Sequence, residues 1–344
     1  MTGGFTPGLT CRWNHSLLGS IFGPKKQLHD LSGRVAVVTG GAFGIGYEIS
    51  RAFVEAKAKV IMVNRNWDHG SAAIRSIKKD FGSDAPVEWI HCDLGNLEET
   101  RKVFCTIREK EERLDILVLS AGINANQFAL DHDNIEHIFG VNWLGNFYAT
   151  NLLYPLMRRT SKMPSTPAPR IVMESSEVHR ATPSSVKFRS LEEINDSNLG
   201  PIHRYARSKL AMILGVKYGL VERVIKPNGD NIYAIAVHPG TVNTAIQQQL
   251  KDAYPGWFGS LLTNLSLSIG RSPEQGACSA VYAASSPEIE QKGWNGVYLT
   301  DPGKLGKESS QARDPELGAA LWRLSEELVR EKLGEDALAD WHSS

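Results

Sequence analysis

The sequence predicts one α/β domain, a doubly wound sheet of about seven parallel strands flanked by helices. Two observations support this prediction. Short runs rich in Val and Ile alternate with amphipathic stretches along most of the 344 residues, in the order that parallel sheets require. The first of these runs also leads directly into a glycine-rich turn, which is typical of doubly wound sheets. The length would allow two average domains, but the alternation is continuous, and we therefore expect a single domain.

The glycine-rich turn lies between a predicted strand and a predicted helix. Val35–Thr39 is a β-branched run of the kind that a central parallel strand buries on both faces. Gly40, Gly44 and Gly46 follow, with Ile45 among them. A side chain at these glycines would keep a pyrophosphate away from the backbone N–H groups and the positive dipole of the next helix. The segment therefore predicts a cradle for a nucleotide phosphate.

The remaining elements follow in the same alternating order. Further strands are expected at 59–64, 87–92, 116–120, 170–174, 231–237 and 296–299. Helices are expected at about 44–56, 68–81, 97–113, 134–159, 204–225 and 273–284. Apolar residues recur along one face of the helix at 204–225, which is the pattern of a helix packed on a core.

Two terminal regions lie outside the predicted domain, which spans residues 32–302. Residues 1–31 are rich in Gly, Pro and polar residues and predict an extended arm, which could pack on the body or touch a membrane surface. Residues 303–344 form a helical tail, and the pattern at 314–340 predicts one amphipathic surface helix. Residues 245–271 gather apolar and aromatic side chains, as a lid over a binding pocket would, although packing in the core or between subunits explains them as well.

The composition excludes several classes of partner. The 38 basic and 38 acidic residues give a formal net charge of zero, so we expect neither nucleic acid nor an anionic membrane as a partner. No stretch approaches the roughly 20 apolar residues that a membrane-spanning helix needs. The four cysteines are scattered without the spacing of a metal site, so we expect no metal and a reducing, cytoplasmic location.

A second motif, Tyr205-Ala-Arg-Ser-Lys209, lies near the start of a predicted helix. At this spacing both side chains lie on one helix face, which brings an ammonium group near a phenol. A positive charge favours the phenolate, so Lys209 is expected to lower the pKa of Tyr205 from about 10 and make it a usable acid or base. Tyr and Lys also occur at this spacing by chance, and other residues must decide between the two interpretations.

Polar residues at two other places strengthen the functional interpretation. Ser175 and Ser176 follow the strand at 170–174, at the carboxyl edge where parallel sheets bind ligands. A hydroxyl group there can donate to a substrate oxygen. Asn142 lies in a predicted helix, where it could instead bond to its own backbone.

In this order along the chain, the Gly-x-x-x-Gly-x-Gly turn, Asn142, Ser176, Tyr205 and Lys209 resemble the short-chain dehydrogenase/reductase family over about residues 32–300. The resemblance implies a Rossmann fold and hydride transfer between a nicotinamide and a carbonyl carbon. It implies that Tyr205 donates the proton, that Ser176 holds the substrate oxygen and that Lys209 keeps the phenol acidic and binds the ribose. It also implies that Asn142 holds a water molecule that links the lysine to solvent, and it leaves the serine before Ser176 as a structural neighbour.

The same resemblance implies the contacts of the cofactor. Asn64 ends the second strand, where an acidic residue would bind the ribose 2′-hydroxyl of NAD, and Arg65 follows it. Because a guanidinium group can pair with a 2′-phosphate, the sequence favours NADP(H) over NAD(H). Asp93 matches an aspartate that contacts adenine, and it could also cap a helix. The other expected contacts are Ile45 and the glycines of the turn, Ser120 where the family usually has Asn, Tyr205, Lys209, Val242 and Thr244.

The substrate class is predicted from sequence features outside the catalytic and cofactor motifs. The long separation of Ser176 from Tyr205, and the run Ser-Ser-Glu-Val-His179, resemble the branch of retinol dehydrogenases and WW-domain oxidoreductases, as well as fungal biosynthetic reductases. Together with an apolar lid, this favours reduction of a bulky hydrophobic ketone or aldehyde, for example a polyketide or terpenoid intermediate of secondary metabolism. The alternatives are a retinol- or steroid-type dehydrogenase that works in the oxidative direction and a non-catalytic NADP(H)-binding regulatory protein. Assembly into a homo-oligomer stays open.

Overall fold

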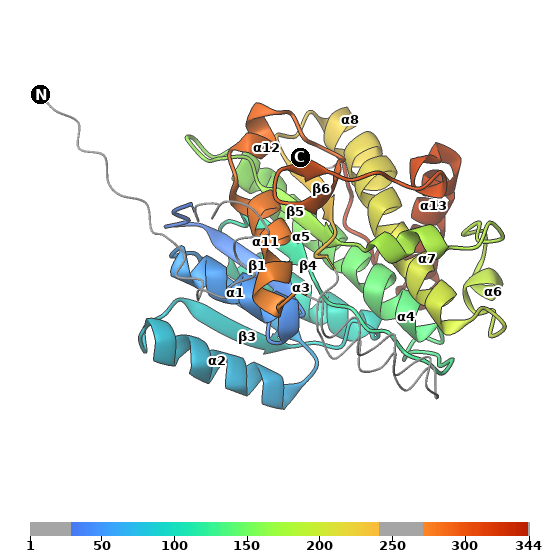
Figure 1. Cartoon of the computed structure of the whole chain (residues 1–344), viewed down its shortest axis with the longest axis horizontal. Coiled ribbons are helices and arrows are strands. Elements are labelled where there is room, and N and C mark those ends of the chain that lie inside the picture. The colour runs from blue at the N-terminus through green and yellow to red at the C-terminus, as the bar shows by residue number, and fades with distance from the viewer. Residues whose placement is uncertain (1–28, 241–270, 343–344) are drawn as a thin grey trace, which may run out of the picture.

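The computed structural model describes residues 29–240 and 271–342. In these residues eight strands form one sheet with the order β3-β2-β1-β4-β5-β6-β7-β8 (Figure 1). Neighbours from β3 through β7 pair in parallel, and β8 pairs with β7 in the antiparallel direction. The strands are β1 (Val35–Thr39), β2 (Lys59–Asn64), β3 (Val87–His91), β4 (Ile116–Leu119), β5 (Arg170–Glu174), β6 (Tyr233–Val237), β7 (Tyr298–Asp301) and β8 (Lys304–Leu305). The predicted doubly wound parallel sheet is confirmed.

Helices cover both faces of this sheet (Figure 1). One layer contains α1 (Gly44–Glu55), α2 (Trp67–Phe81), α11 (Pro273–Ser285) and α12 (Glu288–Gln291). The other contains α3 (Leu97–Lys110), α4 (His137–Phe139), the π-helix η2 (Gly140–Leu144), α5 (Gly145–Ser161), α6 (Leu191–Ile194), α7 (Pro201–Leu214), the π-helix η4 (Gly215–Ile225) and α13 (Pro315–Leu333). Short helical turns lie between these elements, namely η3 (Glu177–Ala181), α8 (Lys226–Asn228) and η5 (Gln311–Arg313).

Each central strand sends alternate side chains into the two hydrophobic layers. In β1, Val37 belongs to the layer of α3, α5 and α7, whereas Ala36 and Val38 belong to the layer of α1, α2 and α11. All three are fully buried. Because a buried aliphatic side chain of this size stabilises a fold by about 1.5–3 kcal/mol, a run of Val with no polar side chain suits a strand covered on both faces.

Two of the predicted helices contain π-helical segments in the structure. The single helix expected at 134–159 is divided into α4, η2 and α5, and Asn142 lies within the π-helical part. The helix expected at 204–225 begins earlier, at Pro201, and continues as a π-helix from Gly215. A side chain at Gly215 would collide with the ring of Trp143, so glycine allows these two helices to approach closely.

The C-terminal region docks on the layer of α5 and α7. The predicted helix at 314–340 is amphipathic but ends at Leu333, because Gly334 takes a φ of 101°. Trp322 of α13 packs edge-on against Phe147, with ring centroids 5.0 Å apart. Trp341, after the helix, packs against Trp322 at 5.1 Å. The tail therefore shares its core with the sheet domain.

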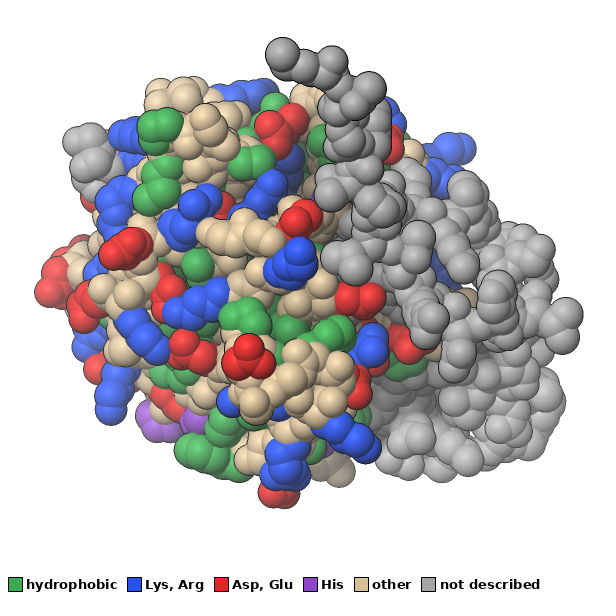
Figure 2. Space-filling model, turned by 90° about the vertical axis from the view of Figure 1, so that its left-hand side faces the viewer, with side chains coloured by type: hydrophobic (Ala, Val, Ile, Leu, Met, Phe, Trp, Pro, Cys, Tyr) green, Lys and Arg blue, Asp and Glu red, His purple; other side chains and the backbone are tan. Residues whose placement is uncertain are grey.

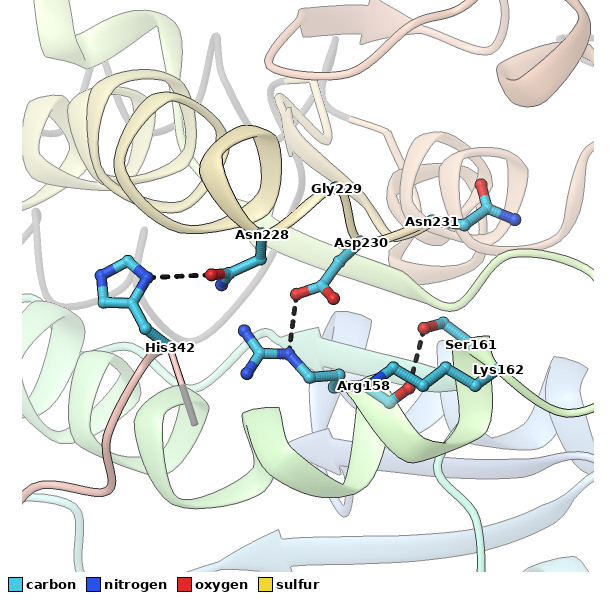
Figure 3. Close-up of a pocket in the computed structure, with 8 residues that line it drawn as sticks. All are labelled: Arg158, Ser161, Lys162, Asn228, Gly229, Asp230, Asn231 and His342. Carbon is cyan, nitrogen blue, oxygen red and sulfur yellow. Dashed lines mark hydrogen bonds and ion pairs between the residues drawn. The ribbon is translucent and has the colours of Figure 1, made fainter. Parts of the chain in front are cut away.

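His342 of the tail also lines a polar pocket, which Figure 3 shows. Arg158 Nε pairs with Asp230 Oδ2 at 2.9 Å, and His342 Nδ1 lies 2.9 Å from Asn228 Oδ1. This pocket adjoins the end of α5 and the start of β6, at the amino ends of the strands. It is therefore remote from the edge of the sheet at which the predicted site residues lie.

Side chains of both signs are interspersed on the described part of the face drawn in Figure 2. None of the helices in the described ranges is long and apolar enough to cross a membrane. The predicted arm, apart from residues 29–31, and the predicted lid, apart from Arg271, lie outside the described residues.

Candidate active site

The glycine turn joins β1 to α1 at the carboxyl edge of the sheet. Gly40 has a φ of 67°, and a Cβ there would lie 2.9 Å from the backbone of Ala121. Gly46 likewise leaves no room for a Cβ, because the carbonyl oxygen of Gly40 occupies that place. Gly44 differs, since it has a φ of 58° and open space around it. Two glycines thus serve packing within the chain, and the third leaves the start of α1 accessible, beside Ile45.

The start of α1 is not capped by the side chain that precedes it. Phe43 precedes the helix and makes no side-chain capping bond, and the first turn holds no acidic residue. By contrast, α2 and α3 are capped by Asn66 and Asn96. Backbone N–H groups at the start of a helix carry a partial positive charge, and an anion can satisfy them. The turn therefore suits a phosphate group.

The expected adenosine contacts at the ends of β2 and β3 all have partners within the chain. Asn64 Oδ1 accepts a hydrogen bond from the indole of Trp89. Arg65 Nη1 lies 3.2 Å from Asp93 Oδ2, and both side chains are partly exposed. Asp93 Oδ1 also accepts from the backbone N–H of Gly95 at 2.9 Å, which closes a turn ahead of α3. The N-cap of α3 is Asn96, so the alternative role of Asp93 as a helix cap is wrong.

Asn142 binds a neighbouring segment and not its own helix. Its Oδ1 accepts from the N–H of Ile123 at 2.7 Å. Its Nδ2 donates to the carbonyl of Ile123 at 2.9 Å and to Ser208 Oγ at 3.0 Å. A Cβ at Gly122 would lie 3.5 Å from both Asn142 Oδ1 and Lys209 Nζ. The π-helical turn therefore delivers this amide group to the neighbourhood of the lysine.

Tyr205 and Lys209 share one face of α7, as predicted. Lys209 Nζ lies 5.5 Å from the centre of the Tyr205 ring and donates to the carbonyl oxygen of Glu174 at 2.8 Å. Ser175 Oγ donates to the carbonyl of Lys209 at 2.7 Å, which ties the end of β5 to α7. Ser176 is partly exposed, and its Oγ accepts from the N–H of Val178 at 3.2 Å.

The electrostatics of the pair differ from the sequence-based expectation. Burial, and then the charge of Glu174, raise the pKa of Tyr205 instead of lowering it. Burial lowers the pKa of Lys209 to about 8. The expectation considered only the ammonium group, and it omitted the loss of solvent around the phenol and the acidic residue at the end of β5.

His179, to which the sequence analysis assigned no role, fixes the backbone of Ser176. The N–H of Ser309 donates to His179 Nε2 at 3.2 Å, so that nitrogen is unprotonated. The proton is accordingly assigned to Nδ1, which lies 2.7 Å from the carbonyl oxygen of Ser176. Burial lowers the pKa of His179, which favours this neutral form. The run Ser-Ser-Glu-Val-His contained the signal, but its partner Ser309 is far away in sequence.

A buried ion cluster holds the start of α7. Arg207 Nη2 lies 3.1 Å from Glu136 Oε2, and Arg204 Nε lies 3.6 Å from Glu136 Oε1. All three side chains are at most 3% exposed. Because Arg204 and Arg207 flank Tyr205 in the sequence, the cluster orients the helix that carries it. Val242 and Thr244, the last two expected cofactor contacts, lie outside the described residues.

Comparison with known proteins agrees with this architecture. The family model for short chain dehydrogenase matches residues 34–181. The WW domain-containing oxidoreductase of Gallus gallus is 35% identical over 316 residues, which cover 90% of this chain and 71% of the relative. The polyprenol dehydrogenase of Danio rerio is 34% identical, with 91% of this chain and 93% of the relative covered. A crystal structure of a putative uncharacterized protein from Mycobacterium paratuberculosis superposes with a TM-score of 0.65 at 28% identity, covering 88% of this chain and 95% of that one. The chain belongs to the short-chain dehydrogenase/reductase family.

Proposed function

We propose that this protein is an NADP(H)-dependent oxidoreductase that reduces the carbonyl group of a bulky hydrophobic small molecule, or oxidises the corresponding alcohol. The observation that carries the proposal is the junction of β5 with α7. This junction brings Ser176, Tyr205 and Lys209 to the carboxyl edge of the sheet, with Asn142 beside the lysine. In open α/β sheets this edge is where ligands bind.

The roles of the residues follow from their chemistry. NADPH, when bound, supplies the hydride that reaches the carbonyl carbon. The Ser176 hydroxyl group donates a hydrogen bond to the substrate oxygen, and the Tyr205 phenol donates a proton to the same oxygen as its negative charge grows. The ammonium group of Lys209 favours the phenolate that remains. Oxidation of the alcohol uses the same groups in reverse.

The phosphate-binding features of the site support a dinucleotide. The open space at Gly44 and the uncapped start of α1 suit the pyrophosphate. Arg65 supports NADP(H), because its guanidinium group is exposed at the end of β2 and can exchange its contact with Asp93 for a 2′-phosphate. Hydrophobic substrates are supported by the apolar composition of residues 245–271. The relative named polyprenol dehydrogenase supports a hydrophobic alcohol as well.

Replacement of Arg65 by Glu tests the cofactor assignment. We expect the Kd for NADPH to rise about 10- to 100-fold, because a charge-assisted hydrogen bond contributes about 1.5–3 kcal/mol and a like charge now faces the phosphate. The Kd for NADH should change much less. The measurement is a fluorescence titration of both cofactors, followed by kcat/KM with each cofactor on an apolar ketone or aldehyde found by screening.

Arg75→Glu is the matched control, since Arg75 is an exposed arginine on α2. It reverses the same charge away from the end of β2 and should leave the ratio of the two Kd values unchanged. Equal losses for NADPH and NADH in Arg65→Glu would refute a 2′-phosphate site at this residue. A failure of every apolar carbonyl to consume NADPH would refute the proposed activity.

A further inference from the structure

A buried carboxyl group lies beside Tyr205 and Lys209, and the proposed chemistry gives it no role. Glu174 ends β5 and is 6% exposed. Ser120 Oγ donates to its Oε2 at 2.9 Å. Its Oε1 is buried and has no hydrogen-bond partner in the described ranges. A buried carboxyl oxygen without a partner is costly, so this side chain needs a compensating interaction nearby.

The charge of Lys209 acts on this carboxyl group without a direct hydrogen bond to it. Its Nζ donates to the carbonyl oxygen of Glu174 at 2.8 Å, so the ammonium group lies against the same residue that carries the carboxyl group. Within the described part of the chain, two titratable groups face this ammonium group, Glu174 from β5 and Tyr205 from the same helix. The neighbours Asn142 and Gly122 are uncharged.

Ser120 connects this group to the glycine turn. It follows β4, and a Cβ at Gly46 would lie 3.1 Å from its Oγ. The hydroxyl group therefore lies between the turn and Glu174, and its hydrogen bond fixes one carboxyl oxygen. The resemblance noted above leads us to expect Asn at position 120. The hydrogen bond from Ser120 to Glu174 at the end of β5 therefore depends on a residue that differs from the one usual in the family.

The ionisation of the two buried groups is coupled. Burial raises the pKa of Glu174 to about 7, and the charge of Lys209 opposes this effect. Burial lowers the pKa of Lys209 to about 8, and the charge of Glu174 opposes that. The same negative charge also adds to the effect of burial in raising the pKa of Tyr205.

We propose that Glu174, held by Ser120, is a positioning residue that keeps Lys209 protonated and thereby extends the activity of the Tyr205 and Lys209 pair to higher pH. The carboxylate stabilises the ammonium form, so Lys209 gives up its proton at a higher pH than burial alone would allow. The catalytic consequence rests on the proposed function, whereas the effect on Lys209 does not.

The experiment follows the titration of Lys209 in the protein without added cofactor, and again with NADP⁺ present, by NMR of protein labelled with ¹³C at the lysine ε-carbon. The resonance is assigned by its loss in Lys209→Arg. Glu174→Gln keeps the size of the side chain and an acceptor for Ser120 but removes the charge. We expect its Lys209 midpoint to lie about one pH unit below that of the wild type, as loss of a nearby opposite charge requires. An unchanged or higher midpoint would overturn the proposal.

Two further variants make the test specific. Glu111→Gln removes another buried carboxylate, which pairs with Lys59 at 2.7 Å near the opposite edge of the sheet, and should leave the Lys209 midpoint unchanged. If Glu174→Gln does not fold, the Lys209 midpoint is measured in Ser120→Ala instead. Loss of its hydrogen bond disfavours the carboxylate, so the Lys209 midpoint should again fall, by a smaller amount, and an unchanged midpoint would count against the proposal.

The pH profile of kcat provides the second readout. If the protein turns over a substrate, the alkaline limb of the profile should move to lower pH in Glu174→Gln, in step with the Lys209 midpoint. A uniform loss of kcat without this movement means that Glu174 serves only the structure, and it contradicts the proposal. If no substrate is turned over, the proposed function fails, yet the NMR titration still decides the role of Glu174.

Discussion

Replacing Tyr205 with Phe is expected to lower kcat by about 10²- to 10⁴-fold, the usual contribution of a positioned general acid. The substitution removes the hydroxyl group and leaves the ring, whose centre lies 5.5 Å from Lys209 Nζ. The glycine turn and the start of α1 are untouched, so the Kd for NADPH should stay within about two-fold. A loss in kcat without a loss in cofactor binding is the signature of an interaction made in the transition state.

The measurement combines steady-state kinetics with a cofactor titration of the same preparation. Tyr218→Phe is the control, because this residue lies on η4, outside the proposed site, and undergoes the same loss of a hydroxyl group. It should retain the kcat of the wild type. Near wild-type turnover by Tyr205→Phe would show that another group donates the proton.

Replacing Glu136 with Gln is expected to destabilise the fold by about 3–5 kcal/mol, because two buried guanidinium groups then lose their anion. Glu136 is 1% exposed and contacts Arg204 and Arg207. Its carboxylate also accepts from the N–H groups of Ile138 and Phe139. Since the two arginines flank Tyr205, activity should fall together with stability.

Urea denaturation gives the free energy of unfolding for this comparison. The control is Glu222→Gln, which removes one partner of an exposed pair with Lys226 whose charged atoms are closer still, at 2.6 Å. Such surface pairs contribute about 0–1 kcal/mol. If both variants lost the same small amount, the buried cluster would not be the support of α7 that its geometry indicates.

The strands could be predicted because a buried strand shows itself locally, as a short run of apolar residues. The bounds of β1, β2 and β5 agree with the predicted ranges. Each contains a run of apolar residues that suits a strand covered on both faces. The short strand β8 was missed, because Lys304 and Leu305 are exposed and carry no alternating pattern. Its pairing depends on β7 and not on its own residues.

The π-helical interruptions of the helices could not be predicted from the local pattern of apolar residues. The π-helical turn around Asn142 depends on a contact with the backbone of Ile123, which the helical period does not report. Two boundaries did have local signals that were not used. Pro201 after Gly200 marks the start of α7, and Gly334 marks the end of α13.

Some residues of the candidate site could be predicted from local sequence, and others could not. The motif residues could be named from their types, spacing and order, and the structure brings Asn142, Tyr205 and Lys209 close to one another. Glu174 and His179 could not be assigned from pattern alone. Their roles depend on Ser120 and Ser309, which tertiary folding brings to them.

Transfer of deuterium from NADPH that carries deuterium at both hydrogens of the nicotinamide C4 is the most direct test of the proposed reaction. Mass spectrometry of the alcohol formed from an apolar ketone should find one deuterium on the former carbonyl carbon, and Tyr205→Phe should form this product far more slowly. Hydrogen from water at that carbon, or tight NADPH binding without transfer to any apolar carbonyl compound, would contradict hydride transfer at Ser176, Tyr205 and Lys209.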